Sequence, residues 1–221
     1  MAIEIIKPQI FIEEPIHGEE ILKKLERFGR ISHKSEEKIG IETAKIFIKK
    51  LLEMGHESVL EHVSITVRFI CDRGVTHELV RHRLAAYTQE STRYCNYAGT
   101  AIKFIKPLFY DEGTEKYNLW YQSCLLSAKA YSSLIKCGSK PQEARSVLPN
   151  SLKTEIVSTF NLREWRHVLK MRCQEAAHPQ IREIMIPVLE KFQREIPIIF
   201  DNLTIEKNEN LSFPFCVTLN Q

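Results

Sequence analysis

Three consecutive side chains, Arg81, His82 and Arg83, are the most informative feature of this 221-residue sequence. Seven residues separate them from Ser91, and Arg93 lies two positions further on. Such a run is a poor core segment, because unpaired charges are almost never fully buried. A guanidinium group is a planar fork of donors that binds phosphate or a planar ring carrying negative charge. The pattern therefore predicts a phosphorylated, planar ligand.

Ser91 could be considered as a nucleophile. A serine nucleophile needs a positioned base and usually a Gly-x-Ser-x-Gly elbow, and the sequence has no such elbow here. We therefore exclude nucleophilic catalysis and expect the Ser91 hydroxyl, nearby backbone N–H groups and the Arg93 fork to hold a phosphate. A loop that is held together by Arg93 stacking on Tyr87 or Tyr94 is the alternative.

Residues 55–62, Gly-His-Glu-Ser-Val-Leu-Glu-His, place two histidines and two carboxylates between a predicted helix and a predicted strand. Metal ligation is one interpretation, but the spacing of His56 and His62 matches no standard zinc geometry. A polar turn that joins the two elements is the alternative.

Further basic residues lie on a predicted helix that Asn161 caps. Arg163, Arg166, His167 and Lys170 are three or four residues apart and share one helical face. Taken alone, this is typical of an amphipathic helix with a solvated basic side.

Two further features have equally ordinary explanations. On a helix, Glu78 would share a face with Arg81 and His82, which is typical of ion pairs in solvent. Arg145, on a short predicted helix, is by itself typical of a surface residue.

In order along the chain, these motifs resemble the signature of flavin-dependent thymidylate synthases, in which Arg-His-Arg is followed after seven residues by Ser. The family also has His-Glu-[Ser/Thr]-x-x-Glu-His, matched at 56–62, and Arg-x-x-Leu-Pro, matched at 145–149. The resemblance spans residues 30–185. Two positions depart from it: Glu78 stands where some members have Gln, and Ala86 where Ser is frequent.

The resemblance implies the residues of the site. Arg81 and Arg172 are implied as catalytic, the first near the reacting pyrimidine and the second pairing with its edge. The implied FAD contacts are Ser32, His56, Ser58, Glu61, Arg81, His82, Arg83, Asn161, Arg163 and His167. The implied dUMP contacts are Glu78, Glu90, Ser91, Arg93, Arg145 and Arg172.

The implied activity is the reductive methylation of dUMP to dTMP. Methylenetetrahydrofolate donates the carbon, and NADPH reduces a bound FAD that supplies the hydride. The residues agree with this, because no cysteine has a nucleophile context and the cations suit a uracil ring that gains negative charge at O4. The resemblance also implies a homotetramer with shared active sites, in which Arg145 reaches the phosphate from a neighbouring subunit. We expect no metal.

The composition indicates a folded chain with a small ligand. Hydrophobic residues make up 43% of the sequence, and 31 basic against 28 acidic residues give a formal charge of +3. This balance is too even to predict binding to nucleic acid or a membrane. The first residues lack a signal-peptide core, and the six cysteines form no Cys-x-x-Cys pair. We therefore expect a cytoplasmic protein with free thiols.

The pattern of apolar residues predicts an α+β chain, with mixed helices around a small, largely antiparallel sheet in a single catalytic domain, residues 1–221. Strands are predicted at 3–12, 62–71, 101–105 and 152–160. Helices are predicted at 19–28, 35–54, 76–83, 114–136, 141–148, 161–173 and 178–195. Residues 84–99 have few apolar positions, so we expect a loop there.

Two other functions are considered. A small RNA-binding module would use the arginines together with Tyr87, Tyr94 and Tyr97, although the near-neutral charge argues against it. A flavoprotein reductase with another substrate would keep the flavin contacts, but it would not need the arginines of the dUMP site together.

Overall fold

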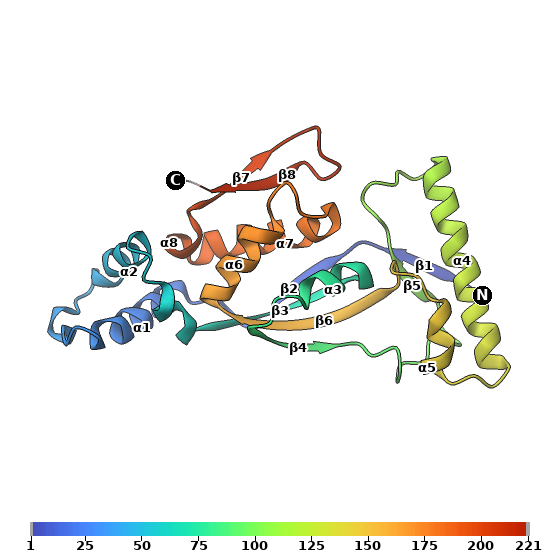
Figure 1. The fold of residues 1–221 in the computed structure, drawn as a ribbon, viewed down its shortest axis with the longest axis horizontal. Coiled ribbons are helices and arrows are strands. Elements are labelled where there is room, and N and C mark those ends of the chain that lie inside the picture. Colours follow the sequence, from blue (N-terminus) through green and yellow to red (C-terminus); the bar gives the residue numbers. More distant parts are fainter. Residues whose placement is uncertain (1, 220–221) are drawn as a thin grey trace. The chain divides into compact units, whose positions relative to one another are not determined.

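The structure, a computed structural model, describes residues 2–219 and divides into two compact units (Figure 1). Within the described residues, unit 1 consists of residues 2–10, Arg68–Arg81 and Tyr87–Val157. Unit 2 consists of Phe11–Val67, His82–Ala86 and residues 158–219.

The described strands form small, mostly antiparallel sheets, so the predicted α+β class is confirmed. One sheet has the strand order β2-β3-β6-β4, β1 pairs with β5 in parallel, and β7 pairs with β8 in antiparallel. The strands are β1 Ile3–Ile6, β2 Gln9–Ile12, β3 Ser64–Asp72, β4 Ala85–Gln89, β5 Ile102–Ile105, β6 Lys153–Asn161, β7 Leu203–Lys207 and β8 Phe215–Leu219.

The core of unit 1 forms where a long helix packs on the β1–β5 pair (Figure 1). The helix α4 buries Ala128 and Tyr131 against Phe104 of β5. A shorter helix begins where the Asp72 carboxylate accepts the backbone N–H of Val75 at 2.8 Å, which is an N-cap. The helices of unit 1 are α3 Arg73–Leu79, α4 Glu115–Lys136, α5 Pro141–Ala144 and the 3₁₀ turn η3 Arg145–Val147.

Unit 2 is held together by aromatic packing around Trp165. Its ring is fully buried, meets Phe160 and Phe192 edge to face, and donates its Nε1–H to the carbonyl of Ile65 at 3.0 Å. These contacts fix the apolar side of α6, so the basic side faces outward, as predicted. The helices of unit 2 are α1 Gly18–Ile31, η1 Glu36–Lys38, α2 Thr43–Glu53, η2 Glu57–His62, α6 Leu162–Arg172, α7 Pro179–Glu195 and α8 Pro197–Phe200.

The prediction of one helix over residues 35–54 is wrong. Ser35 makes no side-chain cap, and only the three-residue turn η1 follows it. The chain then becomes extended at Ile39, and Gly40 donates its N–H to Thr43 Oγ1 at 2.9 Å. A new helix, α2, begins at Thr43.

The predicted helix over residues 76–83 is also wrong in its second half. α3 ends at Leu79, whose carbonyl accepts the Tyr87 hydroxyl at 2.7 Å instead of continuing the helical ladder. Glu78 and His82 therefore do not share a helical face. Residues 84–99 are not all loop, because β4 occupies Ala85–Gln89.

The prediction stopped short at the C-terminal end. The predicted helix over residues 178–195 agrees with α7, which His178 caps, but α8 and the β7–β8 hairpin were not predicted. Alternation in residues 203–207, followed by the turn residues of 208–214, was the available signal. Among residues 2–219, no helix has the length and hydropathy of a membrane span.

Candidate active site

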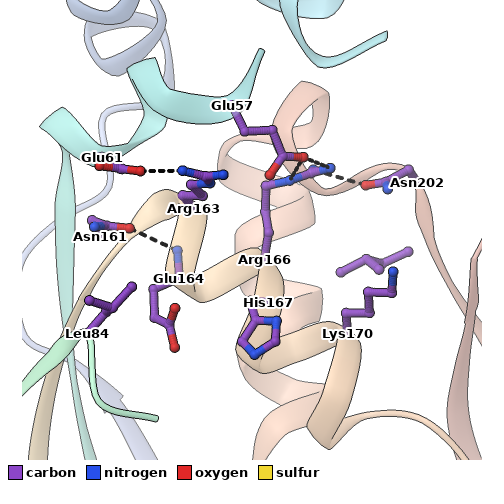
Figure 2. Close-up of a pocket in the computed structure, with 11 residues that line it drawn as sticks. Glu57, Glu61, Leu84, Asn161, Arg163, Glu164, Arg166, His167, Lys170 and Asn202 are labelled. Carbon is purple, nitrogen blue, oxygen red and sulfur yellow. Dashed lines mark hydrogen bonds and ion pairs between the residues drawn. The ribbon is translucent and has the colours of Figure 1, made fainter. Parts of the chain in front are cut away.

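The basic face of α6 lines a cavity of about 560 Å³ in unit 2 (Figure 2). Three elements supply the other walls: η2, the segment before β4, and the start of the C-terminal hairpin. The lining residues are Glu57, Glu61, Leu84, Asn161, Arg163, Glu164, Arg166, His167, Lys170, Asn202 and Leu203.

The start of α6 is positioned by its cap. Asn161 Oδ1 accepts the backbone N–H of Glu164 at 2.8 Å, as the sequence predicted. At the second position of the helix, Arg163 pairs with Glu61 of η2, with its Nη1 2.5 Å from the carboxylate oxygen. Both side chains are about half exposed, 52% and 47%, so the pair contributes little stability. Its main effect is to align two predicted flavin contacts.

Arg166 connects three segments around the cavity and was not predicted as a site residue. Its guanidinium pairs with Glu57 at 3.1 Å and donates to Asn202 Oδ1 at 3.0 Å and to the carbonyl of Ile199 (Figure 2). Its side chain is 14% exposed. The spacing of the basic residues in the sequence predicted correctly that Arg166 shares a helical face with Arg163 and His167. Its partners could not be foreseen, because two of them lie in or beside elements that were not predicted.

A second cavity of about 590 Å³ lies beside the first and shares Glu57, Glu61 and Arg163 with it. Together the two cavities bring together seven of the predicted FAD contacts. These are Ser32, His56, Ser58, Glu61, Asn161, Arg163 and His167.

Arg172 and His82 are in contact in unit 2, although they are 90 residues apart in sequence. Arg172 Nε donates to His82 Nε2 at 3.0 Å, and His82 Nδ1 lies 3.5 Å from Glu164 Oε1. The ring of His167 is 5.6 Å away from that of His82. Burial, then the charge of Arg172, and then His167 lower the pKa of His82 from 6.5 to about 4, so the ring is neutral near pH 7.

His82, Glu164 and His167 each offer a possible metal ligand, with the three atoms within 4.8 Å of one another. A cation there would face the permanent charge of Arg172, whose Nε already lies 3.0 Å from His82 Nε2. The donor set is therefore a poor match for a metal ion.

In unit 1, the loop after β4 carries the predicted phosphate ligands. Ser91 Oγ accepts the backbone N–H of Arg93 at 3.3 Å, and Arg145 Nη1 donates to Thr92 Oγ1 at 3.1 Å. Arg93 and Arg145 are both exposed. The Arg93 guanidinium also lies 5.4 Å from the centre of the Tyr94 ring, so the stacking contact considered for this loop is present.

Glu90, the first residue of that loop, has partners for both oxygens of its carboxylate. One carboxylate oxygen accepts the Tyr97 hydroxyl and the other accepts Lys153 Nζ, both at 2.7 Å. Burial and this hydrogen bond raise the pKa of Tyr97. These two hydrogen bonds connect the start of the loop to Tyr97 and to β6.

The remaining predicted residues lie elsewhere. Glu78 is half-buried in α3, Arg81 is exposed in the turn that follows, and Arg83 is exposed before β4. Neither arginine lines the two cavities of unit 2.

Comparison with known proteins assigns the class. Residues 17–198 match the thymidylate synthase complementing protein family, and the chain belongs to this family. The resemblance stated from the motifs is thereby confirmed.

Particular relatives carry a more specific name. The chain is 37% identical over 166 residues to the flavin-dependent thymidylate synthase of Pyrococcus abyssi, a match that covers 74% of this chain and 68% of that protein. It is 32% identical over 210 residues to the flavin-dependent thymidylate synthase of Corynebacterium glutamicum, covering 86% and 82%. A UMP/dUMP methylase, PolB from Streptomyces cacaoi, whose crystal structure contains 5-Br dUMP, shares the fold with a TM-score of 0.74 and 20% identity, covering 90% of this chain and 96% of that one.

Proposed function

We propose that this protein is a flavin-dependent thymidylate synthase, a methyltransferase that converts dUMP to dTMP. Methylenetetrahydrofolate is the carbon donor and NADPH the source of reducing equivalents. The observation that carries the proposal is the convergence of seven predicted flavin contacts on two adjoining cavities of unit 2. The names of the family and of the relatives support it.

The two cavities suit FAD in size and in chemistry. Each falls within the range of about 300–1,000 Å³ that is usual for small-molecule sites, and a dinucleotide is long enough to use both. Asn161, Arg163 and His167 supply polar groups on one side, and His56 and Ser58 supply them on the other. Bound FAD would supply the hydride, and the protein would orient the reactants and exclude water.

Arg172 is the proposed catalytic group at the pyrimidine. Its Nε is held by His82 at 3.0 Å, and its Nη donors are the part of a guanidinium that a bidentate contact with a planar edge requires. Such donors stabilise the negative charge that develops on the ring during reaction. Arg81 is the second proposed catalytic residue, and with His82 and Arg83 it completes the proposed flavin contacts.

The loop of unit 1 is the proposed phosphate site of dUMP. Arg93, next to Thr92 in sequence, and Arg145, which donates to Thr92, are both exposed cations, and the Ser91 hydroxyl adds a polar group. Glu90 holds the loop through Tyr97 and Lys153. Glu78 completes the proposed dUMP contacts.

The proposal includes a homotetramer, one catalytic domain per chain, and active sites shared between subunits, with Arg145 supplied in trans. Within one chain Arg145 donates a hydrogen bond to Thr92. The loop and Arg145 of one subunit can therefore contact the phosphate in a neighbouring subunit's site as one group. A cytoplasmic setting is also proposed, and the six free cysteines support it.

The purified protein tests the proposal through its absorption spectrum. We expect a yellow protein whose flavin bands change when dUMP is added. A colourless protein that binds RNA would favour the RNA-binding module. A yellow protein whose spectrum ignores dUMP and responds only to NADPH would favour a reductase that acts on another substrate.

A further inference from the structure

Glu164 has a buried carboxylate that the proposed reaction leaves without a role. At the third position of a helix, a glutamate often turns back toward the cap. In α6 the Glu164 side chain is only 10% exposed, and its Oε1 lies 3.5 Å from His82 Nδ1. Burial raises the pKa of this carboxyl group, and His167 opposes the shift. A buried carboxylate is costly unless it has a partner, so its position beside His82 calls for an explanation.

Arg172 determines which nitrogen of His82 carries the proton. A guanidinium can only donate hydrogen bonds, and Arg172 Nε lies 3.0 Å from His82 Nε2. Nε2 must therefore be the acceptor. The single proton of the neutral ring then lies on Nδ1, which is the atom that faces Glu164.

Packing holds the plane of the His82 ring, but it does not select the tautomer. Phe160 and His167 meet the ring edge to face, with centroids at 6.5 and 5.6 Å. Both tautomers have the same shape, so these contacts accept either one. The tautomer is favoured instead by polar neighbours: Arg172 donates to Nε2, and the Glu164 carboxylate lies beside Nδ1.

We propose that Glu164 is a positioning residue that orients Arg172 through His82. The inference rests on the proposed role of Arg172 at the pyrimidine edge. When the Glu164 carboxylate is removed, the tautomer with its proton on Nε2 becomes more populated. That N–H then meets the Nε–H of Arg172 and displaces the guanidinium.

Two substitutions of Glu164 separate this role from packing. Glu164→Gln keeps an oxygen that can accept the Nδ1 proton, whereas Glu164→Ala removes it. By isothermal titration of the flavin-loaded protein with dUMP, we expect the alanine variant to bind about tenfold more weakly and the glutamine variant within about threefold of wild type. Because Glu164 also lines the first cavity, the FAD content of each variant is measured, and the dissociation constants for dUMP are compared at equal flavin occupancy.

The matched control is Glu26, a carboxylate that is also buried, 1% exposed, and is paired with Arg30 in α1. Glu26→Ala removes a buried acid of the same kind without touching His82. We expect a loss of thermal stability and an unchanged dissociation constant for dUMP. If Glu26→Ala weakens dUMP binding as much as Glu164→Ala, the effect is general destabilisation and the proposal is wrong.

A double-mutant cycle tests the path through Arg172. In an Arg172→Ala background, Glu164→Ala should change dUMP affinity by less than about twofold, because the group it orients is gone. Additive effects of the two changes would overturn the proposal.

Nitrogen NMR of the wild-type protein with ¹⁵N-labelled histidine gives a second readout that does not depend on activity or on a variant that folds. The proposal requires the His82 proton on Nδ1, and a proton on Nε2 would refute it. Failure of the wild-type protein to bind dUMP would instead refute the proposed function, and the role of Glu164 at the pyrimidine would fall with it.

Discussion

The two units present their charged residues in different ways. In unit 1 the exposed cation Arg93 lies in the loop after β4, and the exposed cation Arg145 of η3 donates to Thr92 of that loop. The Glu90 carboxylate of the same loop accepts hydrogen bonds from Tyr97 and Lys153. In unit 2 the basic face of α6 instead lines cavities of about 560 and 590 Å³.

The difference corresponds to the size of the ligand. A phosphate needs a few convergent donors on a firm support and little enclosure. A flavin dinucleotide needs volume and contacts along its length. We therefore propose that unit 1 recognises the phosphate and that unit 2 supplies most of the flavin contacts, with Arg81 of unit 1 as the exception. The predictions below test that division.

Arg172→Ala should have the largest effect. Loss of a donor to developing negative charge costs about 10²–10³ in kcat, so we expect dTMP formation to fall by at least about a hundredfold. FAD should remain bound, because the cavity walls do not include Arg172. Flavin absorbance of the purified variant and a steady-state assay measure the two quantities. Loss of the flavin together with activity would place Arg172 in the cofactor site instead.

Arg93→Ala should affect unit 1 alone. A charge-assisted hydrogen bond contributes about 1.5–3 kcal/mol, so the dissociation constant for dUMP should rise at least about tenfold. FAD affinity should change much less. The control is Tyr94→Leu, which removes the ring beside Arg93 but keeps the cation. If this control weakens dUMP binding as much, Arg93 acts by stacking in the loop and is not a phosphate ligand.

Mixing two variants tests whether Arg145 and Arg172 of one active site belong to different chains. The substitution Arg145→Ala changes unit 1, and Arg172→Ala changes unit 2. If each site combines the two residues from separate subunits, exchange creates some sites with both defects and some with neither, so activity should partly return. Native mass spectrometry shows whether subunits have exchanged. Exchange without recovery would mean that one chain supplies both residues.

The sequence predicted the elements whose signals are local. The cap at Asn161 and the strands β3 and β6 depend on neighbouring residues, and the structure has them. The errors arose where a distant side chain decides the outcome. The end of α3 depends on the hydroxyl of Tyr87, and the start of α2 depends on Thr43, whose Oγ1 donates to Glu26 of α1 at 3.0 Å.

The candidate site shows the same division. Motif resemblance selected seven residues that line the two cavities of unit 2, but it could not select Arg166, because that role depends on Asn202 and Ile199 in a region that was not predicted. The contact between Arg172 and His82 spans 90 residues and carries no periodic signal. Resemblance selected both of these residues, and only the fold relates them to each other.

A further expected effect is on stability at acid pH. His82, faced by Arg172, His167 and Glu164, has its pKa lowered from 6.5 to about 4. Between these values the unfolded chain binds more protons than the folded one, so the free energy of unfolding rises with pH. It should fall by up to about 3 kcal/mol as the pH drops through this window. Denaturant titrations at several pH values measure it.

His82→Asn is the control for that titration, because asparagine does not ionise. The variant should lose the part of the pH dependence that His82 contributes. Identical slopes for the variant and the wild-type protein between pH 6.5 and 4 would show that the ring does not titrate as the structure indicates.

The most direct test of the central claim is dTMP formation by the wild-type protein. The assay contains FAD, NADPH, methylenetetrahydrofolate and dUMP, and each is omitted in turn. We predict that protein carrying FAD forms dTMP only when NADPH, methylenetetrahydrofolate and dUMP are all present. When the dUMP carries an isotope label in its ring, the label should appear in dTMP. Oxidation of NADPH without labelled dTMP, in protein that binds both FAD and dUMP, would contradict the account.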